Sequence, residues 1–412
     1  MLSTFHSDNR KALYARLEPG AVAVMFAGSA PRKTNDEYYP FFADRGFVYL
    51  TGIEQAGSIL LNSSKGETLY ILPKDLIAER WNGRRLDASQ AADISGIQNI
   101  CEEPAFRRDL NALFQSGVET IYLDLYKHAE GEPDDESYKL AAYIKERYPH
   151  IVIKNLRPHI KALRTIKQPC EIAAMRESQR ITAEAVTAMM RASKPGMYEY
   201  QYKAEFDYVL GKYGAPPAFP PIISAGANNF CIHYYAYTGR AGDGDMVLND
   251  VGVSCDNLMN DVSRGWPVNG RFSERQKLLY DCAFATSEHL FGLIKPGMLM
   301  GDVDLTIKKY NFERLKDIGL LNDYGDISKY MWHGGAHHVG YDVHDVTGVR
   351  DSDPIAPGMV FCVDIGIYVE DWGIGFRLED NCLVTESGCE NLSAATPRSI
   401  QEIEDIMYKK KK

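Results

Sequence analysis

The chain has 412 residues, of which 45% are hydrophobic and 25% are charged, and its formal net charge is −10. This composition is typical of an ordinary water-soluble protein, and the negative charge favours neither nucleic acid nor an anionic membrane as a partner. No apolar run approaches the length of a membrane span, the first residues lack a signal-peptide pattern, and the eight cysteines form no CxxC pair. Together these features predict a cytoplasmic protein with free thiols.

The first half of the chain alternates short apolar runs with amphipathic segments. Strands are predicted near 21–26, 58–62, 68–72 and 120–124, and helices over 106–115 and 136–147. Such alternation predicts an α/β domain. A longer helical pattern covers 169–192, so the domain boundary is expected between residues 156 and 168. We therefore expect one domain over 1–160 and a second over 161–412.

Four acidic residues in the second half form two pairs. In the first pair, Asp250 ends an apolar run, Asp261 begins another, and turn-forming residues occupy 254–257. This pattern predicts a β-hairpin. A turn centred on Cys255 and Asp256 would place Asp250 directly opposite Asp261. Opposed residues have Cβ atoms roughly 4.5–5.5 Å apart, so two carboxylates there repel each other unless a cation lies between them.

The second acidic pair repeats this pattern. Asp364 ends the strand-like run 360–364, Glu379 ends the run 375–379, and the loop 370–373 lies between the two runs. A turn centred on the middle of that loop would place Asp364 opposite Glu379. Two hairpins that each bury an acidic pair predict a site that holds two cations.

Histidines gather between the two acidic pairs. Four of the ten histidines lie in the segment 333–344. The glycines at 334 and 335 argue against a helix, so His333 and His337 are not interpreted as a helical zinc pair. A set of carboxylates with one imidazole suits Mn²⁺, Fe²⁺, Co²⁺ or Zn²⁺ better than a thiolate-preferring metal. A single strand aspartate is usually a solvated edge charge, but four matched acids beside a histidine do not fit that interpretation.

These motifs resemble the metal-dependent pita-bread peptidases, specifically aminopeptidase P, over nearly the whole chain. The second half carries the resemblance in Leu248–Gly252, Asp261–Gly270, His333–Asp345, Pro357–Asp364, Arg377–Asp380 and Val384–Leu392. The first half carries it in Arg45–Gly52 and Glu79–Arg85. The resemblance implies an α/β N-terminal domain like that of creatinase and prolidase, followed by an α+β pita-bread catalytic domain.

The resemblance also implies an activity. It points to a dimetal Xaa-Pro aminopeptidase, which hydrolyses the bond between an N-terminal residue and a following proline through a metal-bridging hydroxide. Two divalent cations are implied, Mn²⁺ first, with Co²⁺, Fe²⁺ or Zn²⁺ as alternatives. The implied partners are small peptides with proline at the second position, and the implied assembly is a homodimer or homotetramer. Two alternatives stay open: a prolidase restricted to Xaa-Pro dipeptides, and a catalytically impaired scaffold that binds peptides or proteins.

Roles for individual residues follow from the same resemblance. The implied metal ligands are Asp250, Asp261, His337, Asp364 and Glu379, with Asp261 and Glu379 bridging both cations. The implied catalytic residues are His233, His344 and Asp364, of which the histidines would move a proton or bind the tetrahedral intermediate. The implied substrate-binding residues are His333, Tyr368 and Arg377, of which His333 would line the pocket for the proline ring.

One departure from the family pattern concerns Asp364. The family usually has glutamate followed by Pro-Gly where this chain has Asp364-Ile-Gly. The shorter side chain changes the reach of the carboxylate by about 1.5 Å, and such a displacement can cost on the order of 10²-fold in rate. This position motivates the scaffold alternative. Two milder departures, Ser263 and Gly265-Trp266, replace the usual Thr and Thr-Phe.

Overall fold

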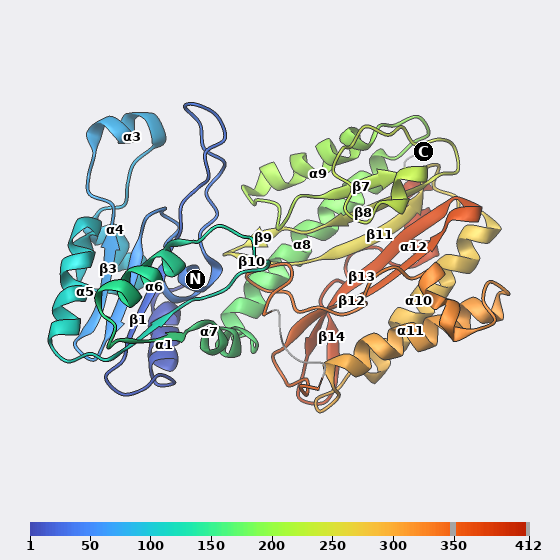
Figure 1. Cartoon of the computed structure of the whole chain (residues 1–412). Coiled ribbons are helices and arrows are strands. Elements are labelled where there is room, and N and C mark those ends of the chain that lie inside the picture. Colours follow the sequence, from blue (N-terminus) through green and yellow to red (C-terminus); the bar gives the residue numbers. More distant parts are fainter. Residues whose placement is uncertain (347–351, 409–412) are drawn as a thin grey trace. The chain divides into compact units, whose positions relative to one another are not determined.

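The computed structural model describes residues 1–346 and 352–408. The chain divides into two compact units, Met1–Arg164 and Thr165–Lys412. Three predicted helices are confirmed with the expected bounds, because the structure contains helices over Phe106–Gln115, Glu136–Arg147 and Pro169–Ala192. Figure 1 shows the elements of both units.

The first unit contains one mixed sheet and seven described helices. Its strands are β1 (Val22–Phe26), β2 (Ile59–Ser63), β3 (Gly66–Ile71), β4 (Ile100–Glu102), β5 (Thr120–Leu123) and β6 (Val152–Asn155). Its helices are α1 (Ser3–Tyr14), α2 (Arg45–Thr51), α3 (Leu76–Asn82), α4 (Ala88–Ser95), α5 (Phe106–Gln115), α6 (Glu136–Arg147) and α7 (Arg157–Arg164). The strand order is β4-β3-β2-β1-β5-β6, with β1 antiparallel to β2 and parallel to β5. The predicted α/β class of this unit is confirmed.

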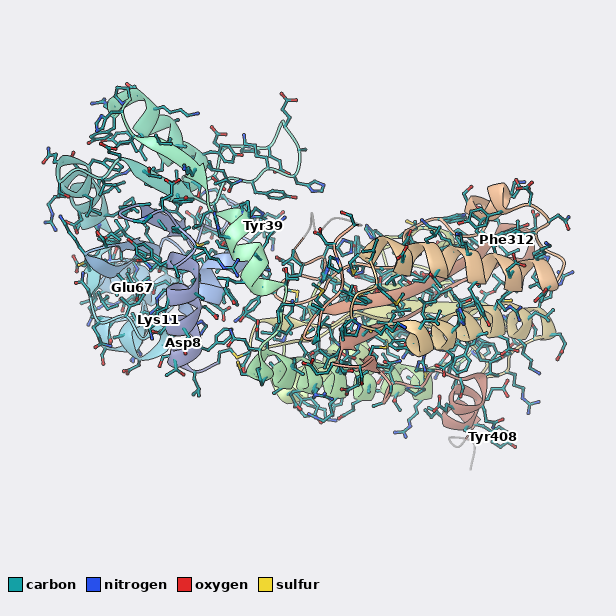
Figure 2. The ribbon with its side chains drawn as sticks, turned by 90° about the horizontal axis from the view of Figure 1, so that it is seen from below. Asp8, Lys11, Tyr39, Glu67, Phe312 and Tyr408 are labelled. Carbon is teal, nitrogen blue, oxygen red and sulfur yellow. The ribbon has the colours of Figure 1, made fainter. Side chains whose placement is uncertain are left out.

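Helix α1 illustrates how the sequence pattern produces this packing. Its exposed side carries the ion pair between Lys11 and Asp8, whose nitrogen and oxygen lie 3.0 Å apart (Figure 2). Its other side buries Phe5 and Leu13. Arg10 is also buried there, and its guanidinium donates to Glu67 at 3.0 Å. The helix therefore separates solvated charges from an apolar face, because its apolar residues recur at helical spacing.

The second unit places strands between two pairs of helices. Its strands are β7 (Ile222–Ala225), β8 (Met246–Val251), β9 (Ser254–Cys255), β10 (Leu258–Met259), β11 (Val262–Pro267), β12 (Val360–Val369), β13 (Ile374–Val384) and β14 (Cys389–Asn391). Its helices are α8 (Pro169–Ala192), α9 (Glu199–Tyr213), α10 (Glu274–Leu293), α11 (Met300–Asp317) and α12 (Ile400–Tyr408). The sheets have the orders β11-β8-β7, β12-β13-β14 and β10-β9. Within this unit, α8 and α9 lie on one side of the strands, and α10 and α11 lie on the other (Figure 1).

The first acidic hairpin forms, but its predicted register is wrong. Asp250 on β8 pairs with Ser263 on β11, not with Asp261. The turn residues are Asp256 and Asn257, with φ angles of 49° and 67°, and both residue types tolerate this left-handed conformation. Because the turn lies one residue later than expected, the register shifts by two residues. An even shift keeps every side chain on its face, so Asp261 remains a diagonal neighbour of Asp250.

The second acidic hairpin has the predicted register. Asp364 on β12 pairs directly with Glu379 on β13. A single 3-10 turn, η4 (Glu370–Trp372), connects the strands, and Gly373 follows it with a left-handed φ of 65°. Both strands are buried along their whole length. The hairpin therefore carries its two acidic side chains into the interior.

Candidate active site

Four carboxylates from four different positions converge in the second unit. Asp250 lies on β8, Asp261 directly precedes β11, Asp364 lies on β12 and Glu379 lies on β13. The side chains of Asp261, Asp364 and Glu379 are buried. Burial raises the pKa of Asp261, and the charges of Glu379 and Asp250 raise it further. The site thus concentrates negative charge where water does not screen it.

One oxygen of each carboxylate has no hydrogen-bond donor among the residues that the structure describes. These oxygens are Asp250 Oδ1, Asp261 Oδ1, Asp364 Oδ1 and Glu379 Oε1. Burying carboxylates costs several kcal/mol per ion unless opposite charge compensates it, and these four oxygens are the ones left for added positive charge. Divalent cations with oxygen ligands supply it. The residues present therefore fit the expected metals.

His337 adds an imidazole to this group. Its Nε2 lies 3.5 Å from Glu379 Oε1 and 3.7 Å from Asp261 Oδ2. Burial alone would lower the pKa of His337, but the nearby carboxylates of Glu379 and Asp364 raise it. As expected, no helix forms in the described residues around it, 330–346. The imidazole nitrogen thus faces two carboxylates and can share a cation with them.

Arg377 binds the Asp250 carboxylate, and Tyr368 in turn contacts Arg377. Arg377 Nη2 donates to Asp250 Oδ2 at 2.8 Å, and Nη1 donates to the Tyr368 hydroxyl at 3.1 Å. Tyr368 is fully buried and stacks on Trp332, with ring centroids 4.4 Å apart. Burial raises the pKa of Tyr368 to about 12. Its hydroxyl therefore keeps its proton at neutral pH, while the guanidinium fixes the orientation of the carboxylate.

His333 links Asp364 to this pair. Its Nδ1 lies 3.1 Å from Asp364 Oδ2, and its Nε2 lies 3.0 Å from the Tyr368 hydroxyl. Burial alone would lower the pKa of His333, but the Asp364 carboxylate raises it to about 9. The structure therefore places His333 as the ion-pair partner of Asp364.

The two outer histidines differ in their surroundings. The His344 ring centroid lies 4.2 Å from that of His337. Burial and the nearby His337 lower the pKa of His344. His233 is exposed beside Tyr235, with ring centroids 6.2 Å apart, and the carbonyl of its neighbour Ile232 accepts from Arg377 at 3.3 Å. The structure thus gathers the other predicted site residues in one contact network and leaves His233 at its edge.

Three further residues belong to this network, and sequence reasoning did not assign them a role. The Ser263 hydroxyl donates to Glu379 Oε2 at 2.8 Å. Asp304 on α11 accepts from the Gly335 amide at 2.7 Å and so anchors the histidine segment. Cys362 lies two residues before Asp364 on β12, so both side chains project from the same face. The alternation of side chains along the predicted strand 360–364 could therefore have identified Cys362 as a residue of the site.

Comparison with known proteins decides the family. Residues 173–386 match metallopeptidase family M24, and residues 6–122 match the aminopeptidase P N-terminal domain. The chain belongs to metallopeptidase family M24. Its M24 domain and its aminopeptidase P N-terminal domain make it a metalloaminopeptidase of the aminopeptidase P type, and the predicted pita-bread fold is confirmed.

Several known proteins match over nearly their full length. The Xaa-Pro aminopeptidase of Escherichia coli (strain K12) is 31% identical, over 98% of this chain and 97% of that protein. A structure described as a candidate aminopeptidase P from Bacillus anthracis is 33% identical, with a TM-score of 0.96 and coverage of 100% and 99% of the two chains. Aminopeptidase P from E. coli with the inhibitor Pro-Leu is 29% identical, with a TM-score of 0.91 and the same coverage.

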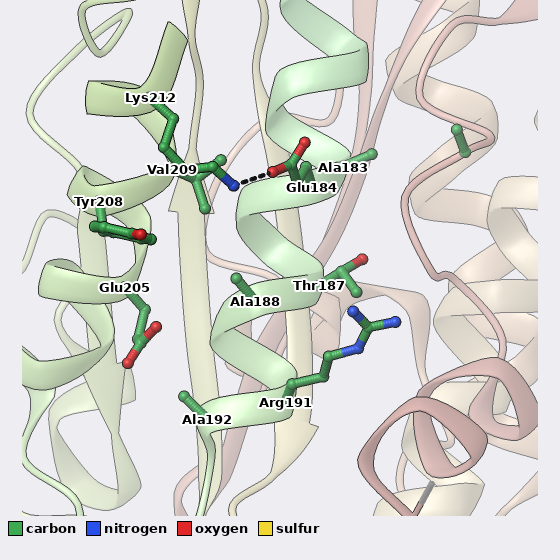
Figure 3. Close-up of a pocket in the computed structure, with 11 residues that line it drawn as sticks. Ala183, Glu184, Thr187, Ala188, Arg191, Ala192, Glu205, Tyr208, Val209 and Lys212 are labelled. Atoms are coloured by element: carbon green, nitrogen blue, oxygen red, sulfur yellow. Dashed lines mark hydrogen bonds and ion pairs between the residues drawn. The ribbon is translucent and has the colours of Figure 1, made fainter. Parts of the chain in front are cut away.

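A surface pocket of the second unit is lined by residues outside the carboxylate network. It is open and sits between α8 and α9, where Lys212 pairs with Glu184 at 2.9 Å (Figure 3). Its lining includes the small residues Ala188 and Ala192 and shares no residue with the carboxylate network.

Over the part of the chain that the structure describes, we also find no helix with the length and apolarity needed to cross a membrane.

Proposed function

We propose that the chain is an Xaa-Pro aminopeptidase that removes the N-terminal residue from peptides with proline at the second position. Residues 1–160 would form its accessory domain and 161–412 its catalytic domain. The observation that carries the proposal is the set of four carboxylates beside His337, each with one oxygen that lacks a donor among the described residues. The names of the relatives support the choice of substrate, because those from E. coli and Haemophilus influenzae are Xaa-Pro aminopeptidases.

The proposed cofactor is a pair of divalent cations. The residues that would hold them are Asp250, Asp261, His337, Asp364 and Glu379, with Asp261 and Glu379 contacting both. When bound, such cations lower the pKa of a water molecule and polarise the scissile carbonyl. The carboxylates and the imidazole alone suit Mn²⁺, Fe²⁺, Co²⁺ or Zn²⁺.

The other residues would position the peptide and handle protons. The free amine of a peptide would lie near Asp250, which explains selection of an N-terminus. His344, whose pKa is lowered by burial and by His337, is neutral at pH 7 and can accept a proton. His333 would line the pocket for the proline ring, Tyr368 and Arg377 would hold the attacking water and the Asp250 carboxylate, and His233 at the edge can move a proton or bind the tetrahedral intermediate. Because a proline amide has no N–H, the site needs no acceptor for one.

Turnover of matched peptides tests this proposal. Metal-stripped protein would be reloaded with Mn²⁺ or Zn²⁺ and given Xaa-Pro-Xaa tripeptides, Xaa-Pro dipeptides and proline-free controls. We expect proline-dependent release of the first residue from the tripeptides, and its loss on chelation. Cleavage of dipeptides alone would establish a prolidase instead.

A second candidate, a peptide-binding scaffold with impaired catalysis, is favoured by one observation. Asp364 replaces the usual glutamate and contacts His333 at 3.1 Å. Asp250, Asp261, His337 and Glu379 argue against this candidate, because they keep the donors that the proposed cations need. Protein that binds two metal ions and peptide but cleaves none of the three substrates would establish the scaffold.

We further propose a homodimer or homotetramer in the cytoplasm. Leu76, Ile77 and Trp81 on α3 are exposed, and an apolar surface of this kind is suited to contact with a second copy. All eight cysteines are free, as a reducing compartment allows. Sedimentation equilibrium of the full chain measures the assembly, and a monomer at all concentrations would contradict it.

A further inference from the structure

A buried thiol lies inside the carboxylate network. Cys362 is 0% exposed, and it is paired directly with Asn381 across the β12–β13 hairpin. Its backbone N–H donates to the His337 carbonyl at 2.8 Å. The hairpin and the histidine segment together therefore fix the thiol next to the imidazole.

The Cys362 sulfur is within reach of the same point as three other donors. Donor atoms from Asp261, His337, Cys362 and Glu379 all lie within 4.8 Å of one another. Asp261 and Glu379 are 4% and 2% exposed, and each has an oxygen without a donor in the described ranges 1–346 and 352–408. An acidic pair with one imidazole and one thiol is a complete four-donor set for a cation.

Asp364 is not part of this four-donor set, in contrast to the expectation from its position. Within the described residues the set contains the other four donors, while Asp364 Oδ2 contacts His333 at 3.1 Å. Cys362, on the same face two residues earlier, is the fourth donor of the set.

The hydrogen bonds of Asn381 show how the sulfur is used. Its amide oxygen accepts from the backbone N–H of Asp261 at 3.1 Å and from Gln179 Nε2 at 2.5 Å. Since a backbone N–H can only donate, the amide nitrogen must face the other way. There it donates to the Asp261 carbonyl at 2.9 Å and to Cys362 Sγ at 3.2 Å. The sulfur therefore accepts a hydrogen bond from Asn381 and is held in place beside the other donors.

We propose that Cys362 is a thiolate ligand of the cation held by Asp261, His337 and Glu379. The centre therefore selects a thiophilic divalent cation of the Zn²⁺, Fe²⁺ or Co²⁺ type over Mn²⁺, because a soft sulfur ligand favours the former and an all-oxygen set the latter. This conclusion rests on the proposed function only in using the same metal centre, and it narrows the choice of metal that the carboxylates alone leave open.

Spectroscopy of the metal-loaded full chain tests the ligand directly. One equivalent of Co²⁺ is expected to produce a sulfur-to-cobalt charge-transfer band in the near ultraviolet. One equivalent of Zn²⁺ is expected to show a sulfur neighbour at about 2.3 Å in its X-ray absorption spectrum. Both signals should disappear in Cys362→Ser and persist in Cys382→Ser. Cys382 is a matched control because it is equally buried but packs in the hydrophobic core.

Metal competition gives a second measurement. In Cys362→Ser the ratio of Zn²⁺ to Mn²⁺ affinity should fall at least as much as on loss of an outer-shell partner, about 10–100-fold. Only nitrogen and oxygen neighbours around zinc in the wild type, or an unchanged ratio, would overturn the inference. The X-ray absorption spectrum of the zinc-loaded wild type shows whether sulfur is a ligand, even if the Cys362→Ser variant does not fold.

The two proposals fail in different ways. A sulfur neighbour without turnover of any proline peptide would overturn the proposed function and leave the thiolate ligand standing. Proline-dependent turnover with no sulfur neighbour would overturn the thiolate ligand and leave the proposed function standing.

Discussion

Asp364 and Glu379 are paired across one hairpin, but their side chains make different contacts. Glu379 lies 3.5 Å from His337, whereas Asp364 lies 3.1 Å from His333. The two acids differ by one methylene, which changes the reach by about 1.5 Å. At the scale of single residues, Glu379 lies inside the four-donor set, and the shorter Asp364 pairs with His333.

We expect Asp364→Glu to raise kcat/KM for Xaa-Pro peptides with Mn²⁺, because the longer carboxylate restores the reach toward the cations that glutamate has at this position in the family. The gain can reach the order of 10²-fold that a 1 Å misplacement costs. Steady-state kinetics measures it, with Asp371→Glu in the exposed loop as the control. Activity below that of the wild type would mean that the pocket is adapted to aspartate.

At the scale of elements, the two acidic hairpins show how far the sequence predicts the site. The loop at 370–373 has one plausible centre, so the register of β12 and β13 was predicted correctly. The stretch 254–257 holds several turn-forming residues, and their pattern does not say which two adopt left-handed φ angles. The error moved the register by an even number of residues, so the faces were still right.

Contacts between different sheets are the part of the site that the sequence does not predict. Ser263 reaches Glu379 because β11 and β13 pack against each other, and no local pattern specifies that approach. The contacts of Asp304 with the histidine segment and of Asn381 with Cys362 depend on tertiary packing in the same way. Periodicity assigns residues to a face, but not to a partner on another element.

The close approach of β11 and β13 leads to a prediction about Gly265. A Cβ added at Gly265 would lie 2.6 Å from Phe376 Cβ, so Gly265→Ala should push the strands apart. We expect a loss of about 1–3 kcal/mol in the free energy of unfolding, measured by urea denaturation. Gly292→Ala on α10 is the matched control, since it meets nothing within 4 Å. Equal stability of the two variants would contradict the proposed packing constraint.

At the scale of the whole molecule, the two units respond to different conditions. The first unit contains a buried histidine, His6, whose pKa is lowered from 6.5 to about 4, mainly by burial. The second unit contains the four carboxylates and the donors beside them. Acid and metal removal should therefore act on different parts of the chain.

We expect the first unit to lose stability as the pH falls from 6.5 to 4. The folded pKa of His6 lies below the unfolded value, so the unfolded chain binds the proton first; the stabilisation is complete above pH 6.5 and disappears toward pH 4. The loss is on the order of 3 kcal/mol. Amide hydrogen exchange of α1 and α2 measures it, and His6→Gln should weaken the dependence. His128→Gln, at an exposed position, should leave it unchanged.

Chelation should instead destabilise the second unit, Thr165–Lys412, because it returns unpaired charge to the buried carboxylates. A cation at a hundred times its dissociation constant stabilises by about 2.7 kcal/mol. Calorimetry with and without chelator should therefore move the transition of this unit and not that of Met1–Arg164. A shift of both transitions by the same amount would contradict this assignment.

The turn at Asp256 and Asn257 has a consequence for insertions and deletions in this hairpin. Side chains alternate along a strand, so the parity of the change decides the outcome. A change of two residues leaves Asp250 and Asp261 on one face. A change of one residue rotates one of them into the apolar layer, unless a β-bulge takes up the difference. An even change therefore keeps both carboxylates at the cation site, and an odd change does so only where a bulge or a three-residue loop absorbs the extra residue.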